Sequence, residues 1–186
     1  MDGTKDFTYS DKAAVRSELL RIRAEITDKL LKSTEIARRA LTLVRGNVMT
    51  YISIDSEVDT VYLNDELLKR GDIVLFAPYT VNGKILPRRV KRFDKPDKYG
   101  NMPSDCYFAS CKIKGIFLDY CITPLVGFND GGYRIGYGKG CYDKFFCDFS
   151  ARKVGLAFES QHANFSEQAH DIPLDCCVTE QKVIYF

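Results

Sequence analysis

Ile73-Val74-Leu75-Phe76-Ala77 is a continuous apolar run that is closed by Pro78. Such runs are typical of a strand in a parallel sheet, because that strand is buried on both faces. The stretch 47–54 is β-branched and aromatic and predicts another strand. Residues 61–70, between the two, predict a helix. Strand, helix and strand at this spacing form a βαβ unit, the basic element of a parallel sheet.

The N-terminal quarter of the chain has a helical pattern. Residues 10–45 place apolar side chains every three or four positions, which predicts a helix with Ser10 as its N-cap. Thr27-Asp28 interrupts the stripe, so we expect the helix to restart there, and Gly46 ends the pattern.

Beyond the βαβ unit, turn residues separate further short elements. Asn82-Gly83 lies between two short apolar stretches and predicts a hairpin. The polar segment Phe93–Ser104 predicts a mobile loop. Strands are expected within 115–124 and at 154–158, a helix over 141–150, and two short strands near the C-terminus.

These elements predict an α/β fold. We expect one three-layer, Rossmann-like domain over residues 1–186, with a largely parallel sheet, helices on both faces and a small hairpin. A chain of 186 residues is long enough to bury a core of its own without further cross-links.

Charge and cysteine content exclude several classes of protein. The 27 basic and 25 acidic residues give a net charge of +2, which provides no general attraction to nucleic acid or to a membrane. The N-terminus is polar and no apolar run is long enough to span a bilayer, so we expect a cytoplasmic protein. The seven cysteines have no zinc-site spacing, and most are expected to be free thiols.

The densest chemical signal is the glycine-rich stretch before the predicted helix at 141–150. Arg134 and Lys139 provide cations there, and Asp143 is a carboxylate of the kind that Mg²⁺ prefers. Glycines let backbone N–H groups approach a phosphate next to a helix start. The stretch matches neither the phosphate-loop motif Gly-x-x-x-x-Gly-Lys-Ser/Thr nor the dinucleotide-binding motif Gly-x-Gly-x-x-Gly after a first strand. A phosphate loop and a simple glycine-rich turn remain equally open. The alternating glycines are Gly136, Gly138 and Gly140.

Other polar residues have both a functional and a structural interpretation. Lys12 and Arg16 are four residues apart and share a helix face, either as a phosphate clamp or as a solvated pair. Glu57 follows a predicted strand, where open α/β sheets bind ligands, or it caps a helix. Asp171 and Asp175 are either metal ligands or turn residues.

Two further features favour a structural interpretation. The basic run 84–95 is more typical of an exposed hairpin than of a nucleic-acid site. His162 and His170 have no identifiable Ser or Cys partner, which argues against a catalytic triad.

In this order and spacing, the motifs resemble the 5-formyltetrahydrofolate cyclo-ligase family, also called methenyltetrahydrofolate synthetases. The resemblance covers about residues 10–185. The most specific match is the stretch Arg134-Ile-Gly-Tyr-Gly-Lys-Gly-Cys-Tyr-Asp143. The remaining matches are Lys12-x-x-x-Arg16, Ser53–Glu57, Gly155-Leu-Ala-Phe158 with Gln161, His170-Asp-Ile-Pro-Leu-Asp175 and Val178-Thr179-Glu180.

The resemblance implies an ATP- and Mg²⁺-dependent ligase of one-carbon metabolism. It would convert 5-formyltetrahydrofolate to 5,10-methenyltetrahydrofolate through an iminium phosphate and release ADP and phosphate. Such chemistry depends on positioning and charge neutralisation more than on a covalent nucleophile. The implied partners are two small molecules, the folate and ATP, without nucleic acid or membrane. We expect a monomer.

The resemblance also implies roles for individual residues. Arg134, Lys139 and Asp143 correspond to catalytic residues, and Glu57 to the acid that meets the pterin. The implied Mg²⁺ ligands are Asp143 and Asp171. The implied ATP contacts are Lys12, Arg16, Arg134, Gly136, Gly138, Lys139, Gly140, Cys141 and Tyr142. The implied folate contacts are Ile52, Glu57, Tyr137 and Cys141.

Two positions depart from the family pattern. Cys141 stands where the family usually has Tyr, and Asn129 where it favours Asp. The Cys141 change leaves open a regulator that binds ATP or folate without turnover. A third interpretation, an unrelated sugar-phosphate enzyme, rests on fold analogy alone.

Overall fold

A computed structural model describes residues 11–93 and 116–186. All but the first residue of the predicted loop Phe93–Ser104 lies outside this part of the chain. The helices and strands described are α1 (Lys12–Glu25), α2 (Lys29–Leu43), β1 (Gly46–Met49), α3 (Val61–Lys69), β2 (Ile73–Val81), β3 (Lys84–Arg89), β4 (Tyr120–Pro124), β5 (Gly127–Phe128), β6 (Arg134–Ile135), α4 (Cys141–Asp148), β7 (Arg152–Leu156), the 3₁₀ helix η1 (Glu159–Gln161), β8 (Cys176–Val178) and β9 (Val183–Tyr185).

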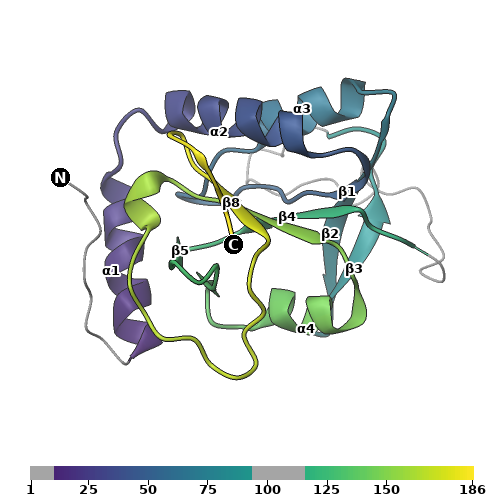
Figure 1. The fold of residues 1–186 in the computed structure, drawn as a ribbon. Helices are drawn as coiled ribbons and strands as arrows, with labels where there is room; N and C mark the ends of the chain where they lie inside the picture. The colour runs from purple at the N-terminus through teal and green to yellow at the C-terminus, as the bar shows by residue number, and fades with distance from the viewer. Residues whose placement is uncertain (1–10, 94–115) are drawn as a thin grey trace.

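The main sheet has the strand order β3-β2-β1-β4-β7-β8-β9 (Figure 1). Its inner strands run parallel, and β3 and β9 pair antiparallel at the two edges. The predicted hairpin at Asn82-Gly83 joins β2 to β3, and both turn residues have positive φ, as the tight hairpin turn requires. The largely parallel α/β sheet predicted from the sequence is confirmed.

Helices cover both faces of the sheet. On one face, Ile36 of α2 and Leu63 of α3 pack in the same core as Val48 of β1. On the other face, Phe145 of α4 packs with Met49 at the end of β1. α1 stands apart from these layers and packs against the small β5–β6 hairpin (Figure 1).

The start of the first helix differs from the prediction. Its N-cap is Asp11, whose side chain accepts a hydrogen bond from the Ala13 N–H at 2.8 Å. The assignment of Ser10 as the cap was wrong, and Ser10 lies outside the described residues. The predicted restart is confirmed, because Asp28 adopts a left-handed conformation directly before α2.

β1 ends at Met49, five residues before the predicted strand end at residue 54. The Tyr51 carbonyl accepts hydrogen bonds from the Thr60 hydroxyl and the Asn64 amide, both at 3.0 Å. Side chains therefore replace a neighbouring strand as partners, and the backbone leaves the sheet. The segment that leaves carries Glu57.

β1 and β4 are adjacent, and the chain leaves them on opposite sides of the sheet: β1 continues through α3 to β2, whereas β4 leads through α4 to β7. In open α/β sheets, ligands bind at the carboxyl ends of strands where the order reverses in this way. Glu57 follows β1 and the glycine-rich loop follows β4, so the topology places both at this position. No helix within residues 11–93 and 116–186 is long and apolar enough to cross a membrane.

Candidate active site

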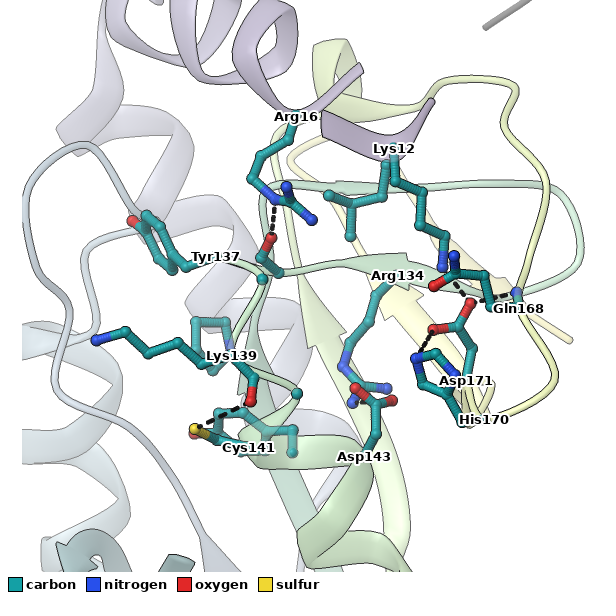
Figure 2. Close-up of a pocket in the computed structure, with 16 residues that line it drawn as sticks. Lys12, Arg16, Arg134, Tyr137, Lys139, Cys141, Asp143, Gln168, His170 and Asp171 are labelled. Atoms are coloured by element: carbon teal, nitrogen blue, oxygen red, sulfur yellow. Dashed lines mark hydrogen bonds and ion pairs between the residues drawn. The ribbon is translucent and has the colours of Figure 1, made fainter. Parts of the chain in front are cut away.

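A cleft of about 270 Å³ lies between the start of α1, the glycine-rich loop and the segment around Asp171 (Figure 2). It collects most of the residues implied by the sequence. The lining residues among them are Lys12, Arg16, Arg134, Gly136, Tyr137, Gly138, Lys139, Gly140, Cys141, Tyr142, Asp143 and Asp171. Ile52 and Glu57 do not line this cleft. Gln168, Pro124 and Ile135 do line it, although sequence analysis assigned no role to them.

Lys12 and Arg16 project from one face of α1 toward the loops of the cleft (Figure 2). The Lys12 ammonium forms an ion pair with Asp171, and both side chains are largely buried. The Arg16 Nε donates to the Gly136 carbonyl at 2.7 Å. Each cation therefore joins α1 to a segment distant in the sequence, which is not the behaviour of a solvated surface pair.

The glycine-rich loop has the local geometry of an anion site. Gly138 and Gly140 have positive φ, which favours glycine. A Cβ on Gly138 would lie 3.4 Å from the Arg16 guanidinium carbon. Within the described residues no side chain caps the N-terminus of α4, which begins at Cys141 after Gly140. Its first N–H groups and their positive dipole are thus available at the cleft.

Arg134 and Asp143 form a partly buried ion pair at the floor of the cleft. The Arg134 Nη2 lies 2.8 Å from the Asp143 Oδ1, and only 5% of the Arg134 side chain is exposed. The Arg134 Nη1 also donates to the Ile172 carbonyl at 2.7 Å. Lys139 is different, since it is exposed and points away from this pair (Figure 2).

Asp143 and Asp171 are the carboxylates of the cleft. Burial raises the pKa of Asp171, but hydrogen bonds from Lys12 and the Gln168 N–H outweigh it and hold this pKa below its ordinary value. In the described residues there is no cluster of three or more metal-ligating side chains. Two carboxylates fit a Mg²⁺ ion that shares its remaining sites with phosphate and water. Asp175, in contrast, lies outside the cleft and pairs with Lys153 at 2.8 Å.

Glu57 is a buried carboxyl outside the cleft lining. Its Oε2 accepts a hydrogen bond from the Ile54 N–H at 3.0 Å. Burial raises the pKa of Glu57, and the Ile54 N–H, Arg23 and the Tyr137 hydroxyl partly oppose that shift. Tyr137 lines the cleft and also acts on Glu57, so it connects the cleft to the segment after β1.

Arg23 was not identified by sequence analysis. Arg23 is 1% exposed, and its Nη2 donates to the Tyr137 hydroxyl at 2.6 Å. The signal was its position, because Arg23 continues the series Lys12, Arg16 and Leu19 along one helix face. An arginine within an apolar stripe is buried with its charge, which calls for specific partners.

The two histidines lie in different surroundings. His162 stacks on Phe128 at a centroid distance of 4.8 Å and contacts Asp130 at 2.8 Å. His170 lines the cleft beside Asp171. In the basic run, Arg88 lies 3.5 Å from the centre of the Tyr79 ring on the β2–β3 hairpin, which agrees with the structural interpretation.

Asn129 holds the β5–β6 turn through both atoms of its side-chain amide. Its Oδ1 accepts from the N–H groups of Gly131 and Tyr133, and its Nδ2 donates to the Phe165 carbonyl at 3.0 Å. The last bond needs an amide, because an aspartate has no donor there. Asn129 therefore provides a contact between the β5–β6 turn and the segment at Phe165.

Comparison with known proteins identifies the family. The model of the 5-formyltetrahydrofolate cyclo-ligase family matches residues 8–180. The chain belongs to this family. A cyclo-ligase of Mycoplasma genitalium is 28% identical over 182 residues, covering 90% of this chain and 97% of that protein. A cyclo-ligase of Mycoplasma pneumoniae is 35% identical over 66 residues, which cover 34% of this chain and 40% of that protein.

The fold of a solved relative agrees with this assignment. The structure of 5,10-methenyltetrahydrofolate synthetase from Aquifex aeolicus aligns with a TM-score of 0.74 at 28% identity, covering 94% of this chain and 92% of that one. The cyclo-ligase resemblance inferred from the motifs is thereby confirmed at the level of family and fold.

Proposed function

We propose that this cyclo-ligase family member converts 5-formyltetrahydrofolate to 5,10-methenyltetrahydrofolate at the cost of one ATP. The observation that carries the proposal is the cationic cleft at the uncapped start of α4, next to the buried carboxyl of Glu57. A triphosphate and a pterin need those two environments side by side. Family membership supports the same substrates, since the relatives are named for this folate.

We assign the cleft to the triphosphate. Lys12, Arg16 and Arg134 bring positive charge to it from two sides, and the N–H groups of the glycine-rich loop and α4 provide donors. Lys139 is exposed and has the length to fold back over a bound phosphate. Lys12 and Arg134 now pair with carboxylates, so phosphate binding exchanges these partners. The remaining proposed contacts are Gly136, Gly138, Gly140, Cys141 and Tyr142.

Asp143 and Asp171 would hold the Mg²⁺ that accompanies ATP. Both carboxylates face the cleft, and the donor set fits an ion that also binds phosphate oxygens. The ion would supply neutralisation of phosphate charge during phosphoryl transfer. These residues themselves orient the cations, because each carboxylate anchors one basic side chain against the cleft wall.

We place the pterin at the carboxyl end of β1. A carboxylate accepts two parallel N–H donors, and the pterin edge presents such donors. Glu57 is buried there and keeps one oxygen bonded to the Ile54 N–H, which fixes its orientation. Ile52, half-buried in the same segment, together with Tyr137 and Cys141, would complete the folate contacts.

The proposed reaction takes place between the two substrates and needs no nucleophile from the protein. The formyl oxygen attacks the γ-phosphorus, an O–P bond forms, and the bond to ADP breaks. The folate N10 then attacks the formyl carbon, a C–N bond forms, N10 loses its proton, and the C–O bond breaks to release phosphate. Negative charge develops on phosphoryl oxygens in both steps. Arg134 and Lys139 are the side chains that we assign to stabilise it.

The test is ADP release that depends on the folate. Purified protein with Mg²⁺ and ATP is expected to form ADP only when 5-formyltetrahydrofolate is present, in equal amounts to the folate consumed. A regulator would bind ATP or the folate without ADP release. An enzyme of sugar phosphates would respond to a sugar phosphate and not to the folate. Either result would reject the proposal.

A further inference from the structure

The Arg23 guanidinium holds three segments together from the interior of the molecule. Its Nε donates to the Ser56 hydroxyl at 3.0 Å, its Nη1 to the Leu125 carbonyl at 3.0 Å, and its Nη2 to the Tyr137 hydroxyl at 2.6 Å. Ser56 is next to Glu57, Leu125 follows β4, and Tyr137 is in the glycine-rich loop. One side chain thus contacts the segments that follow both central strands.

A structural tie alone would not require a positive charge. Burying a guanidinium is costly unless hydrogen bonds and an opposite charge compensate it. Its direct partners here are two hydroxyls and a carbonyl, all of them neutral. The acid that acts on it is Glu57: burial raises the pKa of Glu57, and Arg23 and Tyr137 oppose that shift only in part. The Arg23 hydrogen bonds therefore reach Tyr137 in the loop and Ser56, the residue next to Glu57.

We propose that Arg23 is a positioning residue, which acts through Tyr137 to set the folate carboxylate in register with the nucleotide loop. It is 1% exposed and does not line the cleft, so it does not itself touch ATP. The inference rests on the function proposed above for Glu57. The Arg23 contacts would hold the proposed pterin site at Glu57 and the nucleotide loop in a fixed relative position.

The relative position of the two sites matters because the reacting atoms belong to two substrates, one bound at each site. The γ-phosphorus of one substrate must lie in line with the formyl oxygen of the other. A displacement of about 1 Å at the reacting atoms can cost about a hundredfold in rate. The Arg23 guanidinium carbon also lies 5.5 Å from the centre of the Tyr137 ring, which adds a contact with the ring to the hydrogen bond with its hydroxyl.

A double-mutant cycle tests the route through Tyr137. Arg23→Gln, Tyr137→Phe and the double variant are compared by kcat/KM for the folate and by KM for ATP. We expect Arg23→Gln to lower kcat/KM for the folate at least tenfold and to change KM for ATP less than threefold. In the Tyr137→Phe background, the loss of kcat/KM for the folate that Arg23→Gln causes should be at least threefold smaller. Independent, multiplicative effects would overturn the proposal.

The matched control is Arg21→Gln. Arg21 is in the same helix but is exposed and pairs with Glu18 and Glu25 on α1. We expect unchanged folate kinetics in this variant. An effect as large as that of Arg23→Gln would mean that α1 charge in general, not the Arg23 contact, controls the reaction.

The pH dependence separates positioning from simple support of the fold. Arg23→Gln removes a cation near Glu57, so folate binding should be lost at a higher pH than in the parent. Arg23→Lys keeps the charge and should restore that midpoint without restoring kcat/KM. A merely structural role would leave the midpoint in place. The charged and titratable groups that act with Glu57 are Arg23 on α1, Tyr137 in the loop, Asp55 in its own turn, Tyr51 after β1 and Tyr142 on α4.

Unfolding curves accompany each variant. If Arg23→Gln does not fold, Arg23→Lys replaces it in the cycle, with the same expected coupling to Tyr137→Phe. Failure of this inference is distinct from failure of the proposed function. Unchanged folate binding in Glu57→Gln would reject the assigned pterin site. Weakened binding in Glu57→Gln together with independent effects of Arg23 and Tyr137 would reject only the positioning role.

Discussion

The Arg134 Nη2 lies 2.8 Å from the Asp143 Oδ1, across the turn in which the glycine-rich loop becomes α4. The two residues assigned to phosphate and to metal are therefore each other's partners. Nine positions separate them, and Gly138 and Gly140 between them supply the left-handed turns that bring them together. This pair connects the nucleotide chemistry to the local fold, and a change in either residue also alters the surroundings of the other.

Arg134→Ala should lower kcat/KM for ATP at least tenfold. The variant loses a charge-assisted donor to phosphate, worth about 1.5–3 kcal/mol, and leaves Asp143 without its cation. Steady-state rates at limiting ATP measure the effect. The control is Arg152→Ala, at an exposed position in β7. Activity like that of the parent at limiting ATP would remove Arg134 from the mechanism.

Asp143→Asn should abolish most activity and leave the fold intact. Asparagine keeps the shape of the side chain but lacks the charge that Mg²⁺ needs. Asp148→Asn, at an exposed position in the same helix, is the matched control and should be fully active. Rates are measured against Mg²⁺ concentration and with a chelator. If chelation does not inhibit the parent, the metal role is wrong.

Glu57→Gln should weaken folate binding at least tenfold, equivalent to about 1.4 kcal/mol, and should leave ATP binding unchanged. The amide places a donor opposite the pterin N–H groups. Calorimetry with each substrate measures both effects. An equal loss for ATP would show that Glu57 supports the structure as a whole and that the pterin lies elsewhere.

The pKa of Glu57 adds a pH dependence to this prediction. Burial raises it above its ordinary 4.5, so the folded protein binds this proton more tightly than the unfolded chain does. The contribution of Glu57 to stability is therefore largest at low pH and falls as pH rises through the raised value. Glu57→Gln should unfold no earlier than the parent at neutral pH. Earlier unfolding there would mean that the charge stabilises the fold.

The cysteines report on the nucleotide site. Cys147 is exposed and Cys141 half-buried in the cleft lining, so among the cysteines of residues 11–93 and 116–186 these two should react first with a thiol reagent. Burial raises the pKa of Cys176 to about 11, and raises those of Cys121 and Cys177 as well, so all three should react slowly. Mg²⁺-ATP should slow Cys141 and not Cys147, as followed by mass spectrometry of the alkylated peptides. Equal protection of both, or of neither, would place ATP outside the cleft.

Much of the fold could be predicted because its signals are local. The apolar run Ile73–Ala77 indicated a doubly buried strand, and Asn82-Gly83 indicated a tight hairpin. The true end of β1 could not be predicted, because Tyr51 is released from the sheet by side chains of Thr60 and Asn64 that lie beyond it in the sequence. The β5–β6 pair was missed because each strand has only two residues.

The candidate site was predictable to the extent that it follows one motif. The loop from Arg134 to Asp143 and the α1 cations lie together in the cleft, as expected. Arg23 was missed although it shares a helix face with Leu19, because that position indicates burial but does not identify the partners of its charge. Its role depends on Ser56, Leu125 and Tyr137, which come from three separate segments. Only the three-dimensional structure brings them together.

The most direct test of the central claim is the absorbance of 5,10-methenyltetrahydrofolate, followed after mixing the purified protein with 5-formyltetrahydrofolate. With ATP and Mg²⁺ both present, the absorbance should rise until the folate is consumed, and omission of either should prevent the rise. Binding of ATP and folate without any increase in absorbance would contradict the account.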